Sequence, residues 1–146
     1  MSQLTNAAVP VRQDVIDIEQ KFIRQLAAPG PSLNGKERLA VATAARHGSM
    51  GDNELHGLAN HLYASPSTVT EEHVRAAADS GGEPQTIEVI GIVSRLSAID
   101  RIHQVLDVDL EPLPQSLPGV PTGKIAEDLK RRRCHVPMPP GPIPVA

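Results

Sequence analysis

Apolar residues recur at helical spacing in several separate stretches of the chain. The first stretch covers residues 14–28, where Val15, Ile18, Phe22 and Leu26 follow one another at intervals of three or four. This spacing predicts an amphipathic helix with these residues along one face. A Pro-Gly-Pro sequence at positions 29–31 follows directly and ends that helix.

The middle of the chain predicts two further helices. One starts at Asn34, whose side chain can cap it, and Glu37 stands three residues later in the position of a capping box. It runs to Gly48, a plausible residue after a helix end. After a break, residues 53–64 again show apolar positions on one side and predict a third helix.

Two helices are predicted in the following third of the chain. The fourth is short, begins after Thr70 and stops at a Gly-Gly pair at positions 81 and 82. The fifth and longest opens with Pro84 and continues to about Leu106. It is apolar over much of its circumference, which is typical of a helix buried in a core or at a subunit interface.

The chain thus divides into a flexible arm over residues 1–13, an all-α domain of five to six helices over 14–111, and a Pro-rich extension over 112–146. Nine of the 14 prolines lie between Pro112 and Pro144. Within this extension only residues 122–132 could form a helix. The final residues should be extended or disordered, and they are either a linker or a segment that presents its prolines to a protein partner.

Composition agrees with closely packed helices. The 146 residues contain no Trp, one Phe and one Tyr, so Ala, Leu, Ile and Val must fill the core of one small domain. The net charge is −3, and the basic cluster at 130–133 is short, which argues against a nucleic-acid partner.

Location can also be inferred from what the chain contains. No apolar run approaches the roughly 18 residues of a membrane span, and the first residues lack the pattern of a secretory signal. A single cysteine, Cys134, excludes an intrachain disulfide and fits a reducing compartment. We therefore expect a cytoplasmic protein without a membrane partner.

Residues 37–56 carry the most informative motif. Glu37 stands near the start of a helix, Ser49 and Asp52 are three apart at its end, and His56 follows four residues later. This layout resembles the E…C-x-x-C-x-x-x-H pattern of the alkyl hydroperoxidase D-like branch of the carboxymuconolactone decarboxylase-like superfamily. Thiol chemistry needs an attacking and a resolving thiol, and Ser49 and Asp52 can serve as neither.

A second region supports the resemblance. Residues 67–74 resemble the S-V-T-x-x-x-V helix start of hydroperoxidase-type relatives, a long helix follows, and residues 98–102 resemble the end of that helix. The resemblance covers roughly residues 14–111. It implies an all-α, alkyl hydroperoxidase D-like bundle of bacterial type, here with a Pro-rich C-terminal tail. It also implies a homo-oligomer such as a trimer, a hexamer or a similar ring.

The candidate catalytic residues are His56 and Glu37. The resemblance implies a proton relay for both, and a histidine titrates near neutral pH, which suits that role. Asp52 precedes His56 by four residues and could orient its imidazole from the same helix face. Two other interpretations remain open: Glu37 acts only in a capping box, and His56 lies at the surface without a role.

Other candidates concern binding. Arg46 or Arg101 could hold a carboxylate, with Ser49 and Asp52 nearby as substrate-binding residues. A Ser–His–Asp triad is not favoured, because sequence proximity shows neither its geometry nor an oxyanion hole. The six histidines include no HExxH motif and no Cys/His cluster, so we expect no metal and no cofactor. Three of them could line a pocket with His56: His47, His61 and His103.

Three functions follow from these residues, and they leave open whether the protein is an enzyme. The first is acid/base catalysis on, or binding of, a small carboxylated or lactone-like molecule, with Glu37 or Glu54 as partner of His56. The second is a catalytically inactive relative that acts as an oligomeric scaffold or interaction subunit. The third is an antioxidant peroxidase that uses Cys134 with an external thiol.

Overall fold

The computed structural model describes residues 1–48 and 52–123. These residues form helices joined by loops and contain no β-strand. The expectation of an all-α chain is therefore confirmed for the described residues. The elements, in chain order, are the 3-10 turn η1 (Gln3–Asn6), α1 (Gln13–Leu26), α2 (Gly35–His47), α3 (Glu54–Ala64), the 3-10 turn η2 (Pro66–Thr68), α4 (Glu71–Gly81) and α5 (Glu83–Val105).

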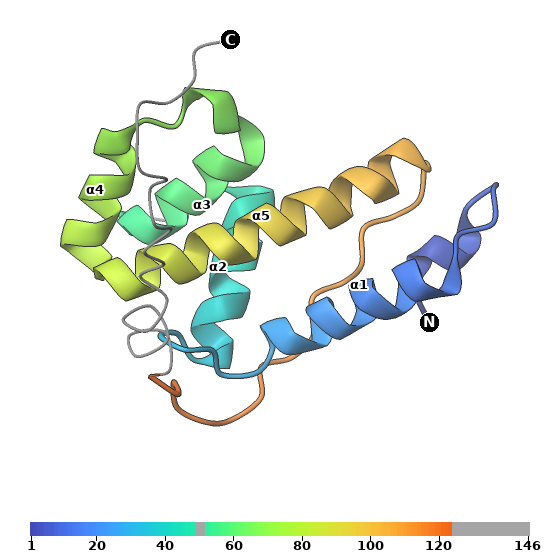
Figure 1. Cartoon of the computed structure of the whole chain (residues 1–146), viewed down its shortest axis with the longest axis horizontal. Coiled ribbons are helices and arrows are strands. Elements are labelled where there is room, and N and C mark those ends of the chain that lie inside the picture. The colour runs from blue at the N-terminus through green and yellow to red at the C-terminus, as the bar shows by residue number, and fades with distance from the viewer. Residues whose placement is uncertain (49–51, 124–146) are drawn as a thin grey trace, which may run out of the picture.

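Helices α2 to α5 pack against one another around a shared core. In Figure 1, α5 crosses α2, and α3 and α4 lie beside its first half. Small and branched side chains fill this core, as the lack of aromatic residues predicts. Its most buried members are Val41, Ala42, Ala45, Ala59, Val89, Val93 and Leu96.

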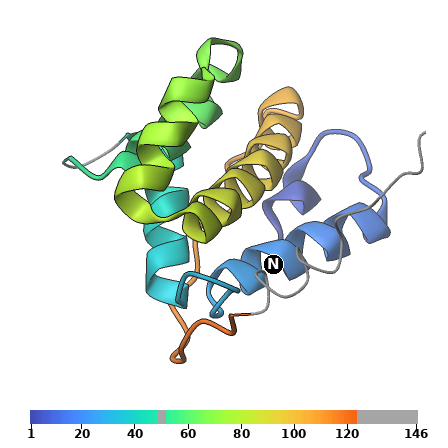
Figure 2. The same ribbon diagram turned by 60° about the vertical axis from the view of Figure 1, so that its left-hand side comes forward.

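Helix α1 lies on the other side of α5 from α3 and α4 (Figure 2). It packs through Phe22, Ile23 and Leu26, as expected from its apolar spacing. The prediction that Ile18 lies on the buried face is wrong. Ile18 is 68% exposed, whereas its neighbour Glu19 is buried. In the first half of α1 the buried residues are Ile16 and Glu19 instead of Val15 and Ile18, and Glu19 can lie there because it finds a buried partner in His103.

After α5 the chain turns at Asp107 and doubles back without helix or strand as far as residue 123; we call residues 107–123 the strap (Figure 1). Its N–H groups donate to carbonyl oxygens at the end of α1 and in the following loop: Leu117 to Ala27 (2.8 Å) and Thr122 to Gly30 (3.0 Å). The first part of the Pro-rich extension is thus ordered on the domain.

The N-terminal residues are also held against the domain, although the sequence predicts a flexible arm there. Ser2 and Leu4 are buried, and Ser2 donates its hydroxyl proton to Glu111 in the strap at 2.8 Å. The helix expected over 122–132 lies outside the described residues except for its first two positions, and Cys134 also lies outside them.

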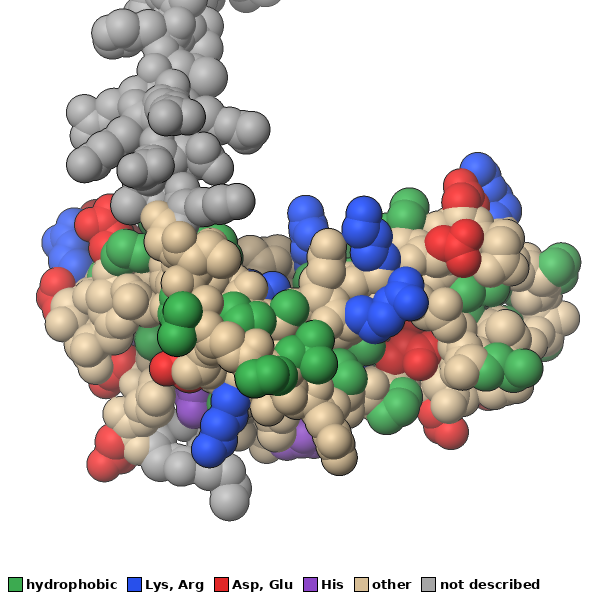
Figure 3. Space-filling view, turned by 90° about the horizontal axis from the view of Figure 1, so that it is seen from below, with side chains coloured by type: hydrophobic (Ala, Val, Ile, Leu, Met, Phe, Trp, Pro, Cys, Tyr) green, Lys and Arg blue, Asp and Glu red, His purple; other side chains and the backbone are tan. Residues whose placement is uncertain are grey.

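In the part of the chain that the structure describes, none of the helices is both long and apolar enough to cross a membrane. Figure 3 shows one face of the molecule, on which acidic and basic side chains are interspersed with apolar ones. This face carries no large area of a single charge.

Candidate functional site

Glu37 and His56 line the same groove, although they come from different helices. The groove has a volume of about 430 Å³ and lies where the starts of α2 and α3 meet the end of α4 and the start of α5. The structure therefore brings the two candidate catalytic residues to one cavity. The full lining is Ser32, Leu33, Lys36, Glu37, Ala40, Val41, Asn53, Leu55, His56, Gly81 and Gln85.

Asparagine caps position both residues. The Asn34 side-chain oxygen accepts from the Glu37 N–H at 2.8 Å and thereby starts α2. The Asn53 side-chain oxygen accepts from the N–H groups of Leu55 (3.0 Å) and His56 (3.2 Å) and starts α3. Two helix N-termini consequently border one groove, and each contributes a partial positive charge.

The carboxylate of Glu37 takes part in the cap. Its Oε2 accepts from the Asn34 N–H at 2.8 Å, which completes the capping box. The predicted capping box of Asn34 and Glu37 is thus confirmed. The exposed side chain of Lys36 also borders the groove and adds a cation to it. Sequence reasoning missed Lys36, because a lysine in the first turn of a helix usually does no more than face solvent.

Neither candidate arginine lies in this groove. Arg46 donates from Nε and Nη2 to the two oxygens of Asp100, at 2.8 and 2.7 Å, and from Nη1 to the Glu111 carbonyl oxygen at 2.8 Å. Its side chain is only 6% exposed, so it joins α2, α5 and the strap. Arg101 borders a different groove, of about 290 Å³, with Tyr63, Ser97 and Gln104.

Asp52 does not share a helix face with His56. It precedes the capping residue Asn53, so it lies outside α3 and is exposed. The i,i+4 relationship that the sequence suggested requires both residues to be helical. Ser49 lies outside the described residues.

The other histidines of the suggested pocket lie elsewhere. His47 is exposed at the end of α2, and His61 contacts the Thr68 hydroxyl at 2.6 Å and the His73 ring at 4.6 Å between centroids. His103 is fully buried near the end of α5. Among these described histidines, only His56 lines the groove.

A second constellation, which sequence reasoning missed, is buried between α1, α5 and the strap. Nε2 of His103 lies 2.6 Å from Oε1 of Glu19, and the carboxylate of Glu111 is close to both. Burial raises the pKa of Glu19, the hydrogen bond and charge of His103 oppose that shift, and the nearby Glu111 adds to it. The only signal in the sequence was the position of Glu19 between Ile16 and Phe22, on the apolar face of α1.

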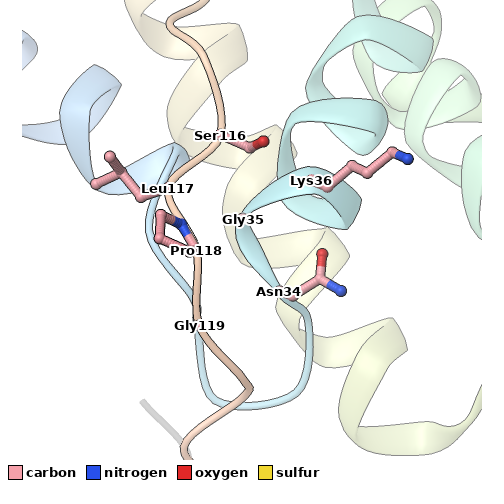
Figure 4. A pocket seen from close by; sticks show the side chains of 7 residues that line it. All are labelled: Asn34, Gly35, Lys36, Ser116, Leu117, Pro118 and Gly119. Carbon is pink, nitrogen blue, oxygen red and sulfur yellow. The ribbon is translucent and has the colours of Figure 1, made fainter.

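The strap also borders a shallower groove of about 350 Å³ at the start of α2. Figure 4 shows Ser116 to Gly119 passing beside Gly35, while the Lys36 side chain extends away from the strap. A Cβ on Gly35 would lie 2.0 Å from the Ala27 carbonyl oxygen. Glycine at this position therefore allows α1, α2 and the strap to approach closely.

Comparisons with known proteins found no relative of this chain. No family model matches the chain, and neither a curated protein nor a solved structure matches it. Membership of the carboxymuconolactone decarboxylase-like superfamily therefore stays a prediction that rests on the motifs at 37–56 and 67–102.

Proposed function

We propose that the chain is a carboxymuconolactone decarboxylase-like protein without thiol peroxidase chemistry that binds a small carboxylated or lactone-like molecule. The binding site is the groove between the starts of α2 and α3. The observation that carries this proposal is that Glu37 and His56, from two different helices, line one groove together with Lys36.

The electrostatics of the groove favour an anionic group. Two helix N-termini border it, and the partial positive charge at such ends attracts carboxylates and phosphates. The Lys36 ammonium adds a positive charge at the same place, whereas the negative charge of Glu37 is held by the Asn34 N–H in the capping box. Leu33, Val41 and Leu55 supply apolar wall, which suits the carbon frame of a small acid or lactone.

His56 is the group best suited to move a proton in this groove. One ring nitrogen of an imidazole can accept a proton while the other donates one, so His56 could act as base or acid in this groove. Glu37 is already held by Asn34, and its main effect is to fix the start of α2. Lys36 and His56 line the same groove, so a small acid that pairs with Lys36 would share that groove with an imidazole that can exchange a proton with it.

A catalytically inactive relative that serves as an oligomeric scaffold is the second candidate. It is favoured by the exposed apolar side chains Ile18 and Val105, which are 68% and 84% exposed. A contact with another subunit would need these side chains to belong to one contiguous apolar patch. The third candidate, a peroxidase, depends on Cys134, which lies outside the described residues.

The binding site is tested by titrating 5-oxotetrahydrofuran-2-carboxylate, a lactone with one carboxylate, into the isotope-labelled full chain. We expect amide shifts at Lys36, Leu55 and His56, and a several-fold weaker affinity in Lys36→Met. Lys21→Met, on the exposed face of α1, is the matched control and should bind like the wild type. Shifts confined to other regions, or equal weakening in both variants, would contradict the proposal.

Catalysis is tested separately by following conversion of the same lactone by NMR. We expect His56→Gln to lower the turnover at least about 100-fold, whereas His61→Gln, on the same helix but outside the groove, keeps it. Glu37→Gln retains the capping hydrogen bond and removes the carboxylate, so it separates capping from proton transfer. Binding without turnover would favour a binding subunit, and neither binding nor turnover in the folded chain would favour the scaffold.

A further inference from the structure

Three ionisable side chains from distant parts of the chain meet in the interior of the protein. Glu19 comes from α1, His103 from the last turn of α5, and Glu111 from the strap. They are 2%, 0% and 8% exposed, respectively. One nitrogen or oxygen atom from each lies within 4.8 Å of the other two. The proposed groove at Glu37 and His56 contains none of these residues.

The hydrogen bond at Nδ1 determines which ring nitrogen of His103 is free to bind a metal ion. Nδ1 lies 2.6 Å from the carbonyl oxygen of Asp109, and a carbonyl can only accept, so Nδ1 carries a proton. The neutral ring therefore has its lone pair on Nε2, which faces Glu19 at 2.6 Å. Histidines that bind metals commonly have their other ring N–H held by a carbonyl oxygen in this way.

The two carboxylates are held in place and retain unused acceptor capacity. Oε1 of Glu111 accepts from the Ser2 hydroxyl at 2.8 Å and from the Gln3 N–H. Oε2 of Glu19 is buried and has no hydrogen-bond partner. A buried carboxylate oxygen without a partner is costly, and either a proton shared with Glu111 or a bound cation removes that cost.

We propose that Glu19, His103 and Glu111 bind one divalent transition-metal ion, for which Zn²⁺ is the best match. Two carboxylate oxygens and one imidazole nitrogen form a mixed oxygen and nitrogen donor set of the kind that Zn²⁺ accepts. Two negative charges on the ligands also balance the charge of the ion. Mg²⁺ fits less well, since it prefers oxygen ligands in a regular octahedron and keeps its waters.

Loading this site requires the proton shared between Nε2 of His103 and Oε1 of Glu19 to leave to solvent, followed by a rearrangement of the carboxylates. Ligand atoms bound to one tetrahedral Zn²⁺ at about 2.0–2.1 Å lie roughly 3.3 Å apart, whereas Nε2 of His103 and Oε1 of Glu19 are now at hydrogen-bond distance. The Glu19 carboxylate must therefore retreat by somewhat less than 1 Å or rotate its free Oε2 toward the ion. Glu111, whose ligand atom lies within 4.8 Å of the other two, approaches the ion as far as the tetrahedral spacing requires, while His103 keeps its hydrogen bond to Asp109.

The test measures Zn²⁺ affinity of the full chain, produced without a polyhistidine tag and stripped with EDTA, by competition with a chromophoric chelator. A Cys134→Ser, His135→Asn background removes the thiol and imidazole of the C-terminal region as competing ligands. Glu19→Gln and His103→Gln keep the size and hydrogen-bonding capacity of the side chains. Asp17→Asn, on the exposed side of α1, and His61→Asn, from the exposed histidine pair, are the matched controls.

We expect one Zn²⁺ per chain, unchanged binding in both controls, and at least tenfold weaker binding in Glu19→Gln and His103→Gln. Zn²⁺ should raise the melting temperature of the parent protein and of the controls, and this rise should shrink in the two ligand variants. Equal affinity in parent and ligand variants would overturn the proposal. Loss of binding in His61→Asn would also overturn it, as would the absence of one-to-one binding by the folded parent. Glu19, His103 and Glu111 would then be a buried cluster that shares protons and binds no metal.

Should the ligand variants fail to fold, the visible spectrum of Co²⁺ bound to the parent protein still decides the question. A low-coordinate site with oxygen and nitrogen donors gives intense d–d bands, whereas Co²⁺ held loosely at the surface remains octahedral and pale. Intense bands that Zn²⁺ displaces at one equivalent would support the site. A pale octahedral spectrum would contradict it.

Discussion

The hydroxyl of Tyr63 donates to Oδ2 of Asp100 at 2.7 Å, and the same carboxylate accepts two hydrogen bonds from Arg46. Asp100 is 1% exposed, so this arrangement satisfies a charge in the interior. The three residues come from α3, α5 and α2, and Arg46 also reaches the strap through the Glu111 carbonyl. One buried carboxylate thus connects most of the domain.

The first prediction concerns the titration of Tyr63. Burial and the neighbouring Asp100 raise the pKa of its phenol from 10 to about 12. Tyr63 is the only tyrosine and the chain has no tryptophan, so absorbance of the folded protein near 295 nm reports this group alone. We expect a midpoint near pH 12, and a midpoint near pH 10 in the folded protein would contradict the geometry.

The raised pKa also predicts how stability depends on pH. The folded state favours the neutral phenol, so the contribution of Tyr63 is complete below pH 10 and is lost as pH rises from 10 toward 12. We expect Tyr63→Phe to cost about 1 kcal/mol at pH 8 and less at pH 11. Urea unfolding of both proteins at the two pH values measures this, and a cost that grows with pH would be the contrary result.

Removing Arg46 should be the most harmful single change among the described ion pairs. Arg46→Met leaves Asp100 buried without its cation, which typically costs about 3–5 kcal/mol. Arg95→Met, at an exposed position of α5, removes the same charge and should change the free energy of unfolding by less than about 0.5 kcal/mol. Chemical denaturation of the two variants provides the comparison, and equal effects would refute the assigned role.

Two glycines should respond in opposite directions to replacement by alanine. Gly91 is exposed within α5 and a Cβ there meets nothing within 4 Å, so Gly91→Ala should stabilise by about 0.5–1 kcal/mol. Gly35→Ala would place its Cβ 2.0 Å from the Ala27 carbonyl oxygen, so α1 and α2 must shift apart. We expect a clearly lower melting temperature for Gly35→Ala, and a stabilising effect would show that this contact is not tight.

The caps of α2 and α3 can be tested by replacing their asparagines. Asn34→Ala and Asn53→Ala each remove side-chain hydrogen bonds to helix N–H groups and should cost about 1 kcal/mol. Glu37→Gln should cost less, because glutamine can take the same place in the capping box. Thermal unfolding measures all three, and a larger loss from Glu37→Gln than from Asn34→Ala would assign the carboxylate another structural role.

The elements of this fold are predictable because local chemistry marks them. The Asn34–Glu37 capping box, the Pro-Gly-Pro stop after α1 and the Gly pair after α4 all act within a few residues. The presence of Glu37 and His56 in one groove agrees with the motif that first linked them. Lys36, in contrast, belongs to that groove only because of how α2 and α3 pack.

The buried polar contacts could not be predicted from the sequence. Glu19 and His103 are 84 positions apart, and nothing near either residue names its partner. The sequence suggested Arg46 as a cation that could bind a substrate carboxylate. Its true partner, Asp100, stands 54 residues later in a helix whose sequence is mostly apolar. A helical pattern shows which face is buried, but it does not show which polar groups will meet there.

The strap gives the chain a definite order of assembly. Helices α2 to α5 follow one another with short connections, so their mutual contacts close small loops. The buried hydrogen bonds of Glu19 and Ser2 join residues 84 and 109 positions apart, so these contacts of α1 and the N-terminus form only after the far end of the chain has arrived. We therefore expect α1 to dock last during folding and to be the first helix to exchange its amide protons in the native state.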